Sequence, residues 1–413
     1  MRRGRGLFGA ITLTLIAGAA IGHQGDPKLL SIQPPFGGTG YTAGAGAGQS
    51  LPIFPVGGGI SLDAWLTATD LGFPGQHCND CWGYVSPSGR EYALIGTTTA
   101  TVFVEVTTPS QPVVVGSITG GSHINRDMKV FGHYAYSVTE AESTPGQVQS
   151  GIQVIDLSAI DSGTVTLAYT AFSAVKPDTH NIALDTTSGF LYRCGGDTDY
   201  GLRIYDLNPD PVHPTYVSSW HVRYVHDACV VTKPDGQEIA FCCTNHDGSW
   251  PGGEPRLTIL DVTDKLNIIT LSDTSYPNGR FAHQAWPTPD LQYLYLTDEG
   301  DELPRFSPGT KIRIFNISSL TSPQYVGELT NGSTAVDHNV FVKGNKIYAA
   351  NYRSGLRIFN ASNPANPVET KYYDTYPADD DPLWNGLWGV YPFLPSGTII
   401  ASDMERGLFI LHE

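Results

Sequence analysis

The sequence predicts an all-β protein, a seven-bladed β-propeller built from four-stranded blades. Three observations support this prediction: a short alternating segment recurs seven times, its copies are spaced by about 50 residues, and a strand hairpin precedes each copy. A β-sandwich and a long β-solenoid are the competing architectures, but sandwiches seldom repeat so regularly and solenoid rungs are usually shorter. The seven copies are ATVFVE (100–105), GIQVID (151–156), GLRIYD (201–206), RLTILD (256–261), KIRIFN (311–316), GLRIFN (355–360) and GLFILH (407–412).

The chain begins with the features of an export signal. Arg2, Arg3 and Arg5 precede an apolar stretch from Leu7 to Ile21, which is shorter than the roughly 20 residues that a membrane span needs. We therefore expect residues 1–22 to be a signal peptide. The mature protein is then secreted, extracellular or periplasmic, with no transmembrane span after cleavage. An uncleaved N-terminal anchor is the alternative interpretation.

Two segments separate this signal from the first hairpin. Residues 23–58 are rich in Gly and Pro, which favours a flexible segment. Residues 59–67 alternate like a strand, and the last repeat ends at its third strand. A strand from the beginning of the chain can therefore complete the last blade and remove an open sheet edge. We expect one domain over residues 59–413, a propeller whose last blade is closed by the strand at about residues 59–67.

Each blade is expected to begin with two strands joined by a tight turn. Gly or Asp within each turn supplies the backbone conformations that a hairpin loop requires. The recurring segment then forms the third strand, and a further turn leads to the fourth. The seven hairpins are WGYVSPSGREYALIG (82–96), MKVFGHYAYSV (128–138), NIALDTTSGFLYRCG (181–195), ACVVTKPDGQEIAFCC (228–243), AWPTPDLQYLYLTD (285–298), VFVKGNKIYAAN (340–351) and WGVYPFLPSGTIIAS (388–402).

Polar residues recur at the start of the predicted innermost strands. In a propeller these strands line the central channel, and the loops entering them open on the same face as the loops between the second and third strands. The latter loops add acidic residues, including those at 298–302. We therefore predict a ligand site at one mouth of the channel. Its candidate residues are Arg126, Asp127, His180, His226, Asp227, His283, His338, Asn339 and Arg353.

Four of these candidates are histidines, which raises the question of a metal. Imidazole with carboxylate suits a divalent transition metal such as zinc, whereas carboxylates and carbonyls suit calcium. No cofactor is firmly implied, but a divalent cation, Ca or Zn, is one that these residues would admit. Histidines at blade spacing can instead fix one blade against the next by hydrogen bonds, which their repetition favours, or act as general acid and base. The candidate metal ligands are His180, His226, His283 and His338.

The six cysteines of an exported chain are more commonly paired or buried than catalytic. Cys78 and Cys81 form a C-x-x-C, for which a small structural disulfide is favoured over a redox dithiol or half of a zinc site. Counting back from the turn KPDGQ places Cys229 nearly opposite Cys242. A cross-strand disulfide between these two residues is therefore a second candidate.

With the repeats laid out, the chain resembles the choice-of-anchor B family of exported bacterial proteins, which are built from LVIVD-type repeats. The resemblance implies a propeller-like protein of the cell surface or the extracellular space, without an established activity. Members differ in a C-terminal anchoring signal, and no such signal follows the final strand here, which favours release or periplasmic retention. The segments that carry the resemblance are NDCWGYVSPSGREYALIG (79–96), FVEVTTPSQPVVVG (103–116), YVHDACVV (224–231), DVTDK (261–265), DHNVFVKGN (337–345), ANYRSGLRIF (350–359) and GLWGVYPFLPSGTIIASDMERGLFIL (386–411).

We expect a non-enzymatic binding or interaction protein, a monomer with its ligand at the channel mouth. The net charge of −16, from 24 basic and 40 acidic residues, repels phosphate backbones, so the expected partner is a protein, peptide or glycan and no nucleic acid. A metal-dependent, lactonase-like hydrolase that uses the convergent His and Asp side chains is the alternative. Redox chemistry at Cys78 and Cys81 is a third hypothesis. No G-x-S-x-G, H-E-x-x-H or phosphate-binding Gly loop occurs, so binding is favoured over catalysis.

Overall fold

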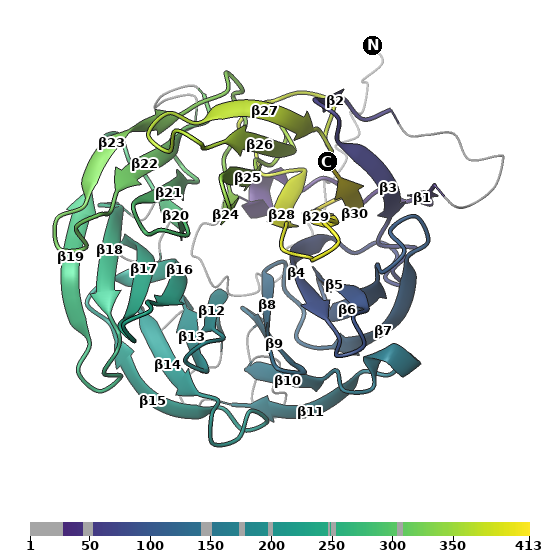
Figure 1. Ribbon diagram of the computed structural model, residues 1–413. Helices are drawn as coiled ribbons and strands as arrows, with labels where there is room; N and C mark the ends of the chain where they lie inside the picture. Colours follow the sequence, from purple (N-terminus) through teal and green to yellow (C-terminus); the bar gives the residue numbers. More distant parts are fainter. Residues whose placement is uncertain are drawn as a thin grey trace, which may run out of the picture.

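The computed structural model describes residues 28–43, 53–141, 151–172, 178–196, 201–246, 248, 253–303 and 309–413. Seven antiparallel sheets are arranged in a ring around a central axis (Figure 1), which confirms the all-β, seven-bladed propeller. The helices of the described residues are α1 (Lys28–Ser31) and the single 3-10 turn η1 (Ile160–Ser162), and neither has the length that a membrane crossing requires. The predicted signal peptide, residues 1–22, lies outside the described residues.

Each blade runs from an innermost strand on the channel to an outermost strand on the rim (Figure 1), in chain order in blades 1 to 6. Blades 1 to 4 are β4 (Cys78–Val85), β5 (Glu91–Thr97), β6 (Ala100–Glu105) and β7 (Val113–Thr119); β8 (Arg126–Phe131), β9 (Tyr134–Thr139), β10 (Ile152–Asp156) and β11 (Thr166–Ala171); β12 (Asn181–Asp185), β13 (Phe190–Cys194), β14 (Leu202–Asp206) and β15 (Thr215–Trp220); β16 (Tyr224–Thr232), β17 (Glu238–Asn245), β18 (Arg256–Asp261) and β19 (Ile269–Ser275). Blades 5 to 7 are β20 (Ala282–Pro287), β21 (Tyr293–Asp298), β22 (Ile312–Asn316) and β23 (Gln324–Leu329); β24 (Asn339–Lys343), β25 (Lys346–Ala350), β26 (Leu356–Asn360) and β27 (Val368–Tyr373); β28 (Leu387–Tyr391), β29 (Ile399–Asp403), β30 (Gly407–His412) and β3 (Ser61–Leu66).

The last blade is closed by an N-terminal strand, as predicted. Strand β3 pairs antiparallel with β30, and Trp65 lies opposite Phe409 with the two rings stacked 5.6 Å apart. The indole N–H of Trp65 donates to the carbonyl oxygen of Arg406 at 2.6 Å. The closing strand occupies Ser61–Leu66, within the predicted residues 59–67.

Two short strands from the predicted Gly/Pro-rich segment extend the outer edge of the ring. Strand β1 (Tyr41–Thr42) pairs with β3, and β2 (Val56–Gly57) pairs with β27. Residues 28–43 and 53–58 are the parts of this segment that the structure describes, and both contact the propeller.

The hydrophobic core lies between neighbouring blades rather than within one. Between blades 1 and 2, for example, Leu94 and Phe103 pack against Met128 and Ala135, and all four side chains are fully buried. The outermost strands expose apolar residues such as Val113. Because each blade is held on both faces, the innermost strands stand at fixed positions around the axis.

The predicted disulfide between Cys229 and Cys242 is wrong, because the two residues are offset by one position in the pairing of their strands. The five-residue turn at 233–237 pairs Cys229 with Phe241, and Cys242 with Ala228. Because a shift of one residue in a strand reverses the side-chain direction, the two sulfurs lie on opposite faces of the sheet.

All six cysteines are free and buried, including Cys78 and Cys81 on either side of a β-bulge. The structure therefore does not support the predicted C-x-x-C disulfide. Burial, with a smaller contribution from Asp403, raises the pKa of the Cys78 thiol to about 12. A neutral, enclosed thiol does not suit redox chemistry.

Candidate functional site

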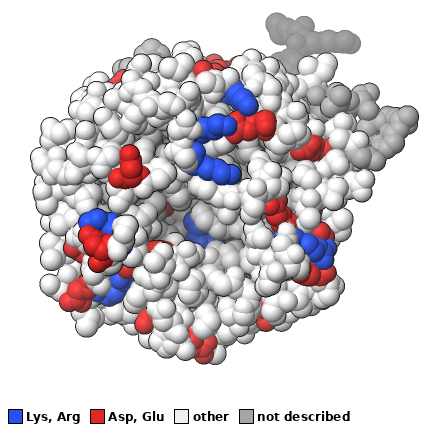
Figure 2. All heavy atoms as spheres, viewed as in Figure 1, with Lys and Arg blue, Asp and Glu red and all other residues white. Residues whose placement is uncertain are grey.

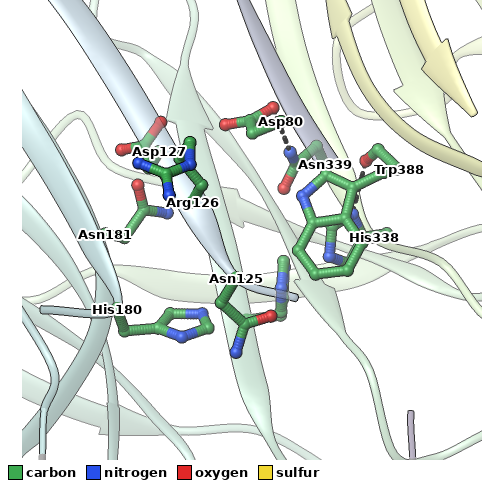
Figure 3. Close-up of a pocket in the computed structure, with 10 residues that line it drawn as sticks. Asp80, Asn125, Arg126, Asp127, His180, Asn181, His338, Asn339 and Trp388 are labelled. Carbon is green, nitrogen blue, oxygen red and sulfur yellow. Dashed lines mark hydrogen bonds between the residues drawn. The ribbon is translucent and has the colours of Figure 1, made fainter. Parts of the chain in front are cut away.

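Polar side chains converge on the channel axis from the first positions of the innermost strands. The pairing of β4, β16, β20 and β28 with their second strands is interrupted there by β-bulges, which re-aim side chains. Figure 3 shows part of two levels of side chains around one small space, with His180 and His338 on one level and Asp80, Asp127, Asn181 and Asn339 on the other. We call one level the His ring: His180, His226, His283 and His338. We call the other the polar belt: Asp80, Asp127, Asn181, Asp227, Gln284 and Asn339.

The four histidines lie side by side around the axis, as their positions in the repeats predicted. Ring centroids are 4.1 Å apart for His180 and His226, 4.4 Å for His226 and His283, and 4.1 Å for His283 and His338. All four are buried. Burial lowers the pKa of His283 and His338 well below the ordinary imidazole value, so both are neutral at physiological pH.

Carbonyl oxygens fix the tautomers of two histidines. Nδ1 of His226 lies 3.0 Å from the carbonyl oxygen of His283, and Nδ1 of His338 lies 2.5 Å from that of Trp388. A carbonyl can only accept, so each Nδ1 carries the proton and each Nε2 presents a lone pair. Nδ1 of His180 lies 2.7 Å from a carboxylate oxygen of Glu140, which favours the same tautomer.

Glu299, which follows β21, lies beside the His ring. Its carboxylate is 3.9 Å from Nε2 of His283 and 3.8 Å from Nε2 of His338, and it accepts a 2.7 Å hydrogen bond from the hydroxyl of Tyr352. One ligand atom from each of His226, His283 and Glu299 lies within 4.8 Å of the others. Sequence analysis placed Glu299 only within the acidic loop 298–302.

The N-terminal segment covers this mouth of the channel. Nζ of Lys28 forms a 3.0 Å ion pair with Glu299 and lies 4.8 Å from the ring centre of Trp388, and Lys28 is only 2 % exposed. Ser31 accepts a 2.8 Å hydrogen bond from the side-chain amide of Asn385. The mouth at which we predicted a ligand site is therefore covered by residues of the same chain.

The polar belt joins neighbouring blades. A carboxylate oxygen of Asp127 in β8 accepts from the backbone N–H of Ile182 in β12 at 2.8 Å, and Oε1 of Gln284 accepts from the N–H of Val340 at 2.6 Å. The other oxygen of Asp127 lies 2.6 Å from Nζ of Lys129. These contacts give Asp127 a structural role between blades 2 and 3.

The remaining candidates are distributed over both levels. Burial raises the pKa of Asp227 to about 7, and Asn339 donates a weak 3.4 Å hydrogen bond to Asp80. Arg126 donates to the carbonyl oxygen of Gly121 at 2.6 Å. Arg353 pairs with Asp379 and Asn385, apart from the His ring.

Among the described residues, two spaces lie along the channel. The small cavity between the His ring and the polar belt (Figure 3) measures about 10 Å³, which is room for about one water-sized sphere. A second pocket of about 400 Å³ lies at the opposite end of the innermost strands. Viewed down the axis, the ring is hollowed at its centre (Figure 2). We call this second space the channel pocket; its lining is Trp82, Lys129, residues 183–187, residues 228–232 and Trp286.

The channel pocket exists because side chains of unequal size face each other. Trp82 and Trp286 form one wall, and the smaller Ala183 and Cys229 lie on another. Lys129 places its ammonium 4.5 Å from the ring centre of Trp82. Sequence analysis missed these residues, although the alternation that places Asp80 and Gln284 on the axis also places Trp82 and Trp286 there, two residues later.

Comparison with known proteins supports the repeat and the fold. The LVIVD repeat matches residues 337–375. No curated protein matches the sequence. A protein from Lactobacillus plantarum is 13% identical, with a TM-score of 0.56 over 79% of this chain and 89% of its own.

Two further solved structures have similar propellers. Hydrazine synthase from Kuenenia stuttgartiensis is 13% identical, with a TM-score of 0.54 over 80% of this chain and 94% of its own. The periplasmic gluconolactonase of Pseudomonas aeruginosa is 11% identical, with a TM-score of 0.53 over 78% and 99%. At such identities the likeness is one of fold.

Proposed function

We propose that this LVIVD-repeat β-propeller is an exported binding protein that holds a small neutral saccharide in the channel pocket. The single observation that carries the proposal is a pocket of about 400 Å³ with two indoles on one wall and polar side chains in its lining. Pockets of about 300–1,000 Å³ are the usual size for small-molecule sites.

The indoles offer flat apolar surfaces in fixed orientations. Trp286 packs against Phe341 at 4.8 Å and Phe393 at 5.9 Å, and Trp82 packs against Tyr391 at 4.9 Å. Rigid aromatic side chains lose little conformational entropy when a ligand binds. The C–H face of a sugar ring matches such a surface.

The polar groups of the channel pocket suit hydroxyl groups better than a charged ligand. Asp185 accepts hydrogen bonds from the hydroxyl of Thr232 and, at 2.9 Å, from the N–H of Thr187, and each carboxylate oxygen has a further lone pair. The cation in the lining, Lys129, is paired with Asp127 at 2.6 Å, so it offers no net attraction to an anion. Basic and acidic side chains are interspersed on the face in Figure 2.

The family and the location that we propose for the protein rest on its sequence. The repeats support membership of the choice-of-anchor B family, and the N-terminal basic and apolar segments support export to the periplasm or the extracellular space. A monomer with a glycan ligand outside the cytoplasm agrees with both.

Titration with saccharides tests the proposal. We expect glucose, galactose, N-acetylglucosamine or cellobiose to change the intrinsic tryptophan fluorescence of the protein saturably. Trp286→Ala, which removes one of the two indoles, and Ala183→Leu, which fills the space, should each weaken binding at least about tenfold. Tyr216→Ala is the matched control, because Tyr216 is 54 % exposed on the outer strand β15. Wild-type protein that is folded and binds none of these sugars at millimolar concentration refutes the proposal.

A metal-dependent, lactonase-like hydrolase is the second candidate. The buried His ring with Glu299 favours it, and the solved propellers of similar fold include a protein named as a gluconolactonase. Such a reaction adds water across the ester bond of the lactone. Acid release from glucono-lactone, measured with and without Zn²⁺ or Ca²⁺ and lost in His283→Ala, would establish it. Equal rates with and without protein would exclude it for that substrate.

A further inference from the structure

We propose that His226, His283, His338 and Glu299 form a binding site for one divalent transition-metal ion of the zinc class, and that Lys28 competes with the ion for Glu299. This site is separate from the channel pocket, since the polar belt lies between them. It therefore does not depend on saccharide binding.

The donor atoms are already close to a coordination geometry. On a tetrahedral zinc ion with bonds of about 2.1 Å, neighbouring ligand atoms lie about 3.4 Å apart. Glu299 lies 3.9 Å from Nε2 of His283 and 3.8 Å from Nε2 of His338. These two contacts use Oε2 and Oε1 of Glu299, and one ligand atom of His226 lies within 4.8 Å of those of His283 and Glu299. A closure of about 0.5 Å at the two Glu299 contacts and of up to about 1.4 Å at His226, by side-chain rotation, would bring the donors to zinc distances.

Hydrogen bonds from Nδ1 to backbone carbonyl oxygens orient two of the imidazoles in the way that metal ligands require. The Nδ1–H groups of His226 and His338 donate to the carbonyl oxygens of His283 and Trp388, at 3.0 and 2.5 Å. A hydrogen bond from the distal ring nitrogen to a carbonyl or carboxylate is the usual support of a metal-bound histidine. In both residues it leaves the Nε2 lone pair to bind the ion.

One buried ring nitrogen points independently to a ligand. Within the described residues, Nε2 of His338 has no hydrogen-bond partner, and the side chain is 2 % exposed. Buried polar atoms are nearly always satisfied, so such atoms need an explanation. The adjoining cavity of about 10 Å³, whose lining includes His283 and His338 but not His226 or Glu299, has room for about one water-sized sphere beside the site and excludes an organic molecule.

Lys28 brings a positive charge to the same carboxylate. Its ammonium lies 3.0 Å from Glu299, over the ring of Trp388. In a buried site a dication and this ammonium would repel strongly. The ion therefore binds when Lys28 withdraws, and the segment from Lys28 to Phe36, which also bonds to Glu405, is released with it.

Calorimetric titration of the full chain with Zn²⁺, after chelator treatment, tests this site. We expect one ion per chain in the wild type, at least about 100-fold weaker binding in His283→Ala and in the isosteric Glu299→Gln, and at least about tenfold tighter binding in Lys28→Met. His213→Ala is the matched control, because His213 is exposed and hydrogen-bonded to Asp210. Zinc should also increase proteolytic cleavage after Lys28 in the wild type.

Each part of the proposal has its own refutation. If neither the wild type nor Lys28→Met binds zinc while both remain folded, there is no metal site. If zinc binds with equal affinity to wild type and His283→Ala, the ion lies elsewhere. If Lys28→Met and wild type bind alike, Lys28 does not compete. Saccharide binding is measured on the same samples, so failure of that function is seen separately.

Discussion

Removing Trp65 should open the ring at its closing blade. The side chain is 6 % exposed, stacks on Phe409 and donates to Arg406. An aromatic side chain buries about 150–250 Å², which at about 25 cal/mol per Å² corresponds to an upper bound of about 4–6 kcal/mol. Truncations of buried Trp to Ala cost about 3–5 kcal/mol. We therefore expect Trp65→Ala to lower the free energy of unfolding by about 3–5 kcal/mol.

Guanidinium denaturation followed by circular dichroism measures this change. Phe172→Ala is the control, because Phe172 is 52 % exposed and should cost less than about 1 kcal/mol. Hydrogen exchange adds a local measurement: amides of β3 and β30 should lose protection together in Trp65→Ala. A loss of under about 1 kcal/mol, or full protection of β30 in the variant, would refute the argument that β3 holds the ring closed.

Three further predictions concern the polar belt, the buried carboxyl group of Glu405 and the six cysteines. Asp127→Ala leaves Lys129 without its closest carboxylate and should lower the free energy of unfolding by about 3–5 kcal/mol in denaturation; a cost under 1 kcal/mol would contradict the structural role of the belt. Burial and then Asp403 raise the pKa of Glu405 from 4.5 to about 7, so its folded form holds a proton more tightly than its unfolded form. The resulting stability is present below about pH 4.5 and is lost as pH rises to about 7. Glu405→Gln should remove about 3 kcal/mol of that decline in pH-dependent melts, and an unchanged profile would refute the shift. A thiol reagent should titrate none of the six buried cysteines in native protein and all six after denaturation, whereas two or four sulfurs missing under denaturing, non-reducing conditions would reveal disulfides.

Much of the fold follows from the sequence because the repeat is local. Each blade satisfies its hairpins and its alternation with residues about 50 positions apart at most, so the copies of GLRIFN can be counted without coordinates. The closing strand could also be predicted, since a blade that lacks its fourth strand leaves an unpaired edge. The same reasoning placed His180, His226, His283 and His338 around one axis.

Register and shape were harder to predict. The position of Cys229 depended on a single residue of the turn at 233–237, and one residue reverses a side chain. The channel pocket depends on Ala183 and Cys229 facing Trp82 and Trp286 from other blades. No local pattern relates the size of a side chain in blade 3 to that of one in blade 5.

The sequence by itself determined the architecture, the number of blades, the strand that closes the ring and the gathering of imidazoles on its axis, because all of these follow from periodicity. Tertiary structure alone decided that Lys28 covers that mouth, that Glu299 rather than its acidic neighbours meets the histidines, and that the larger space lies at the other end. Lys28 and Glu299 lie 271 positions apart, and Trp82 and Trp286 lie 204 positions apart. Glu299 follows His283 by only 16 positions, but which acid of its loop meets the histidines is still chosen by packing and charge in three dimensions.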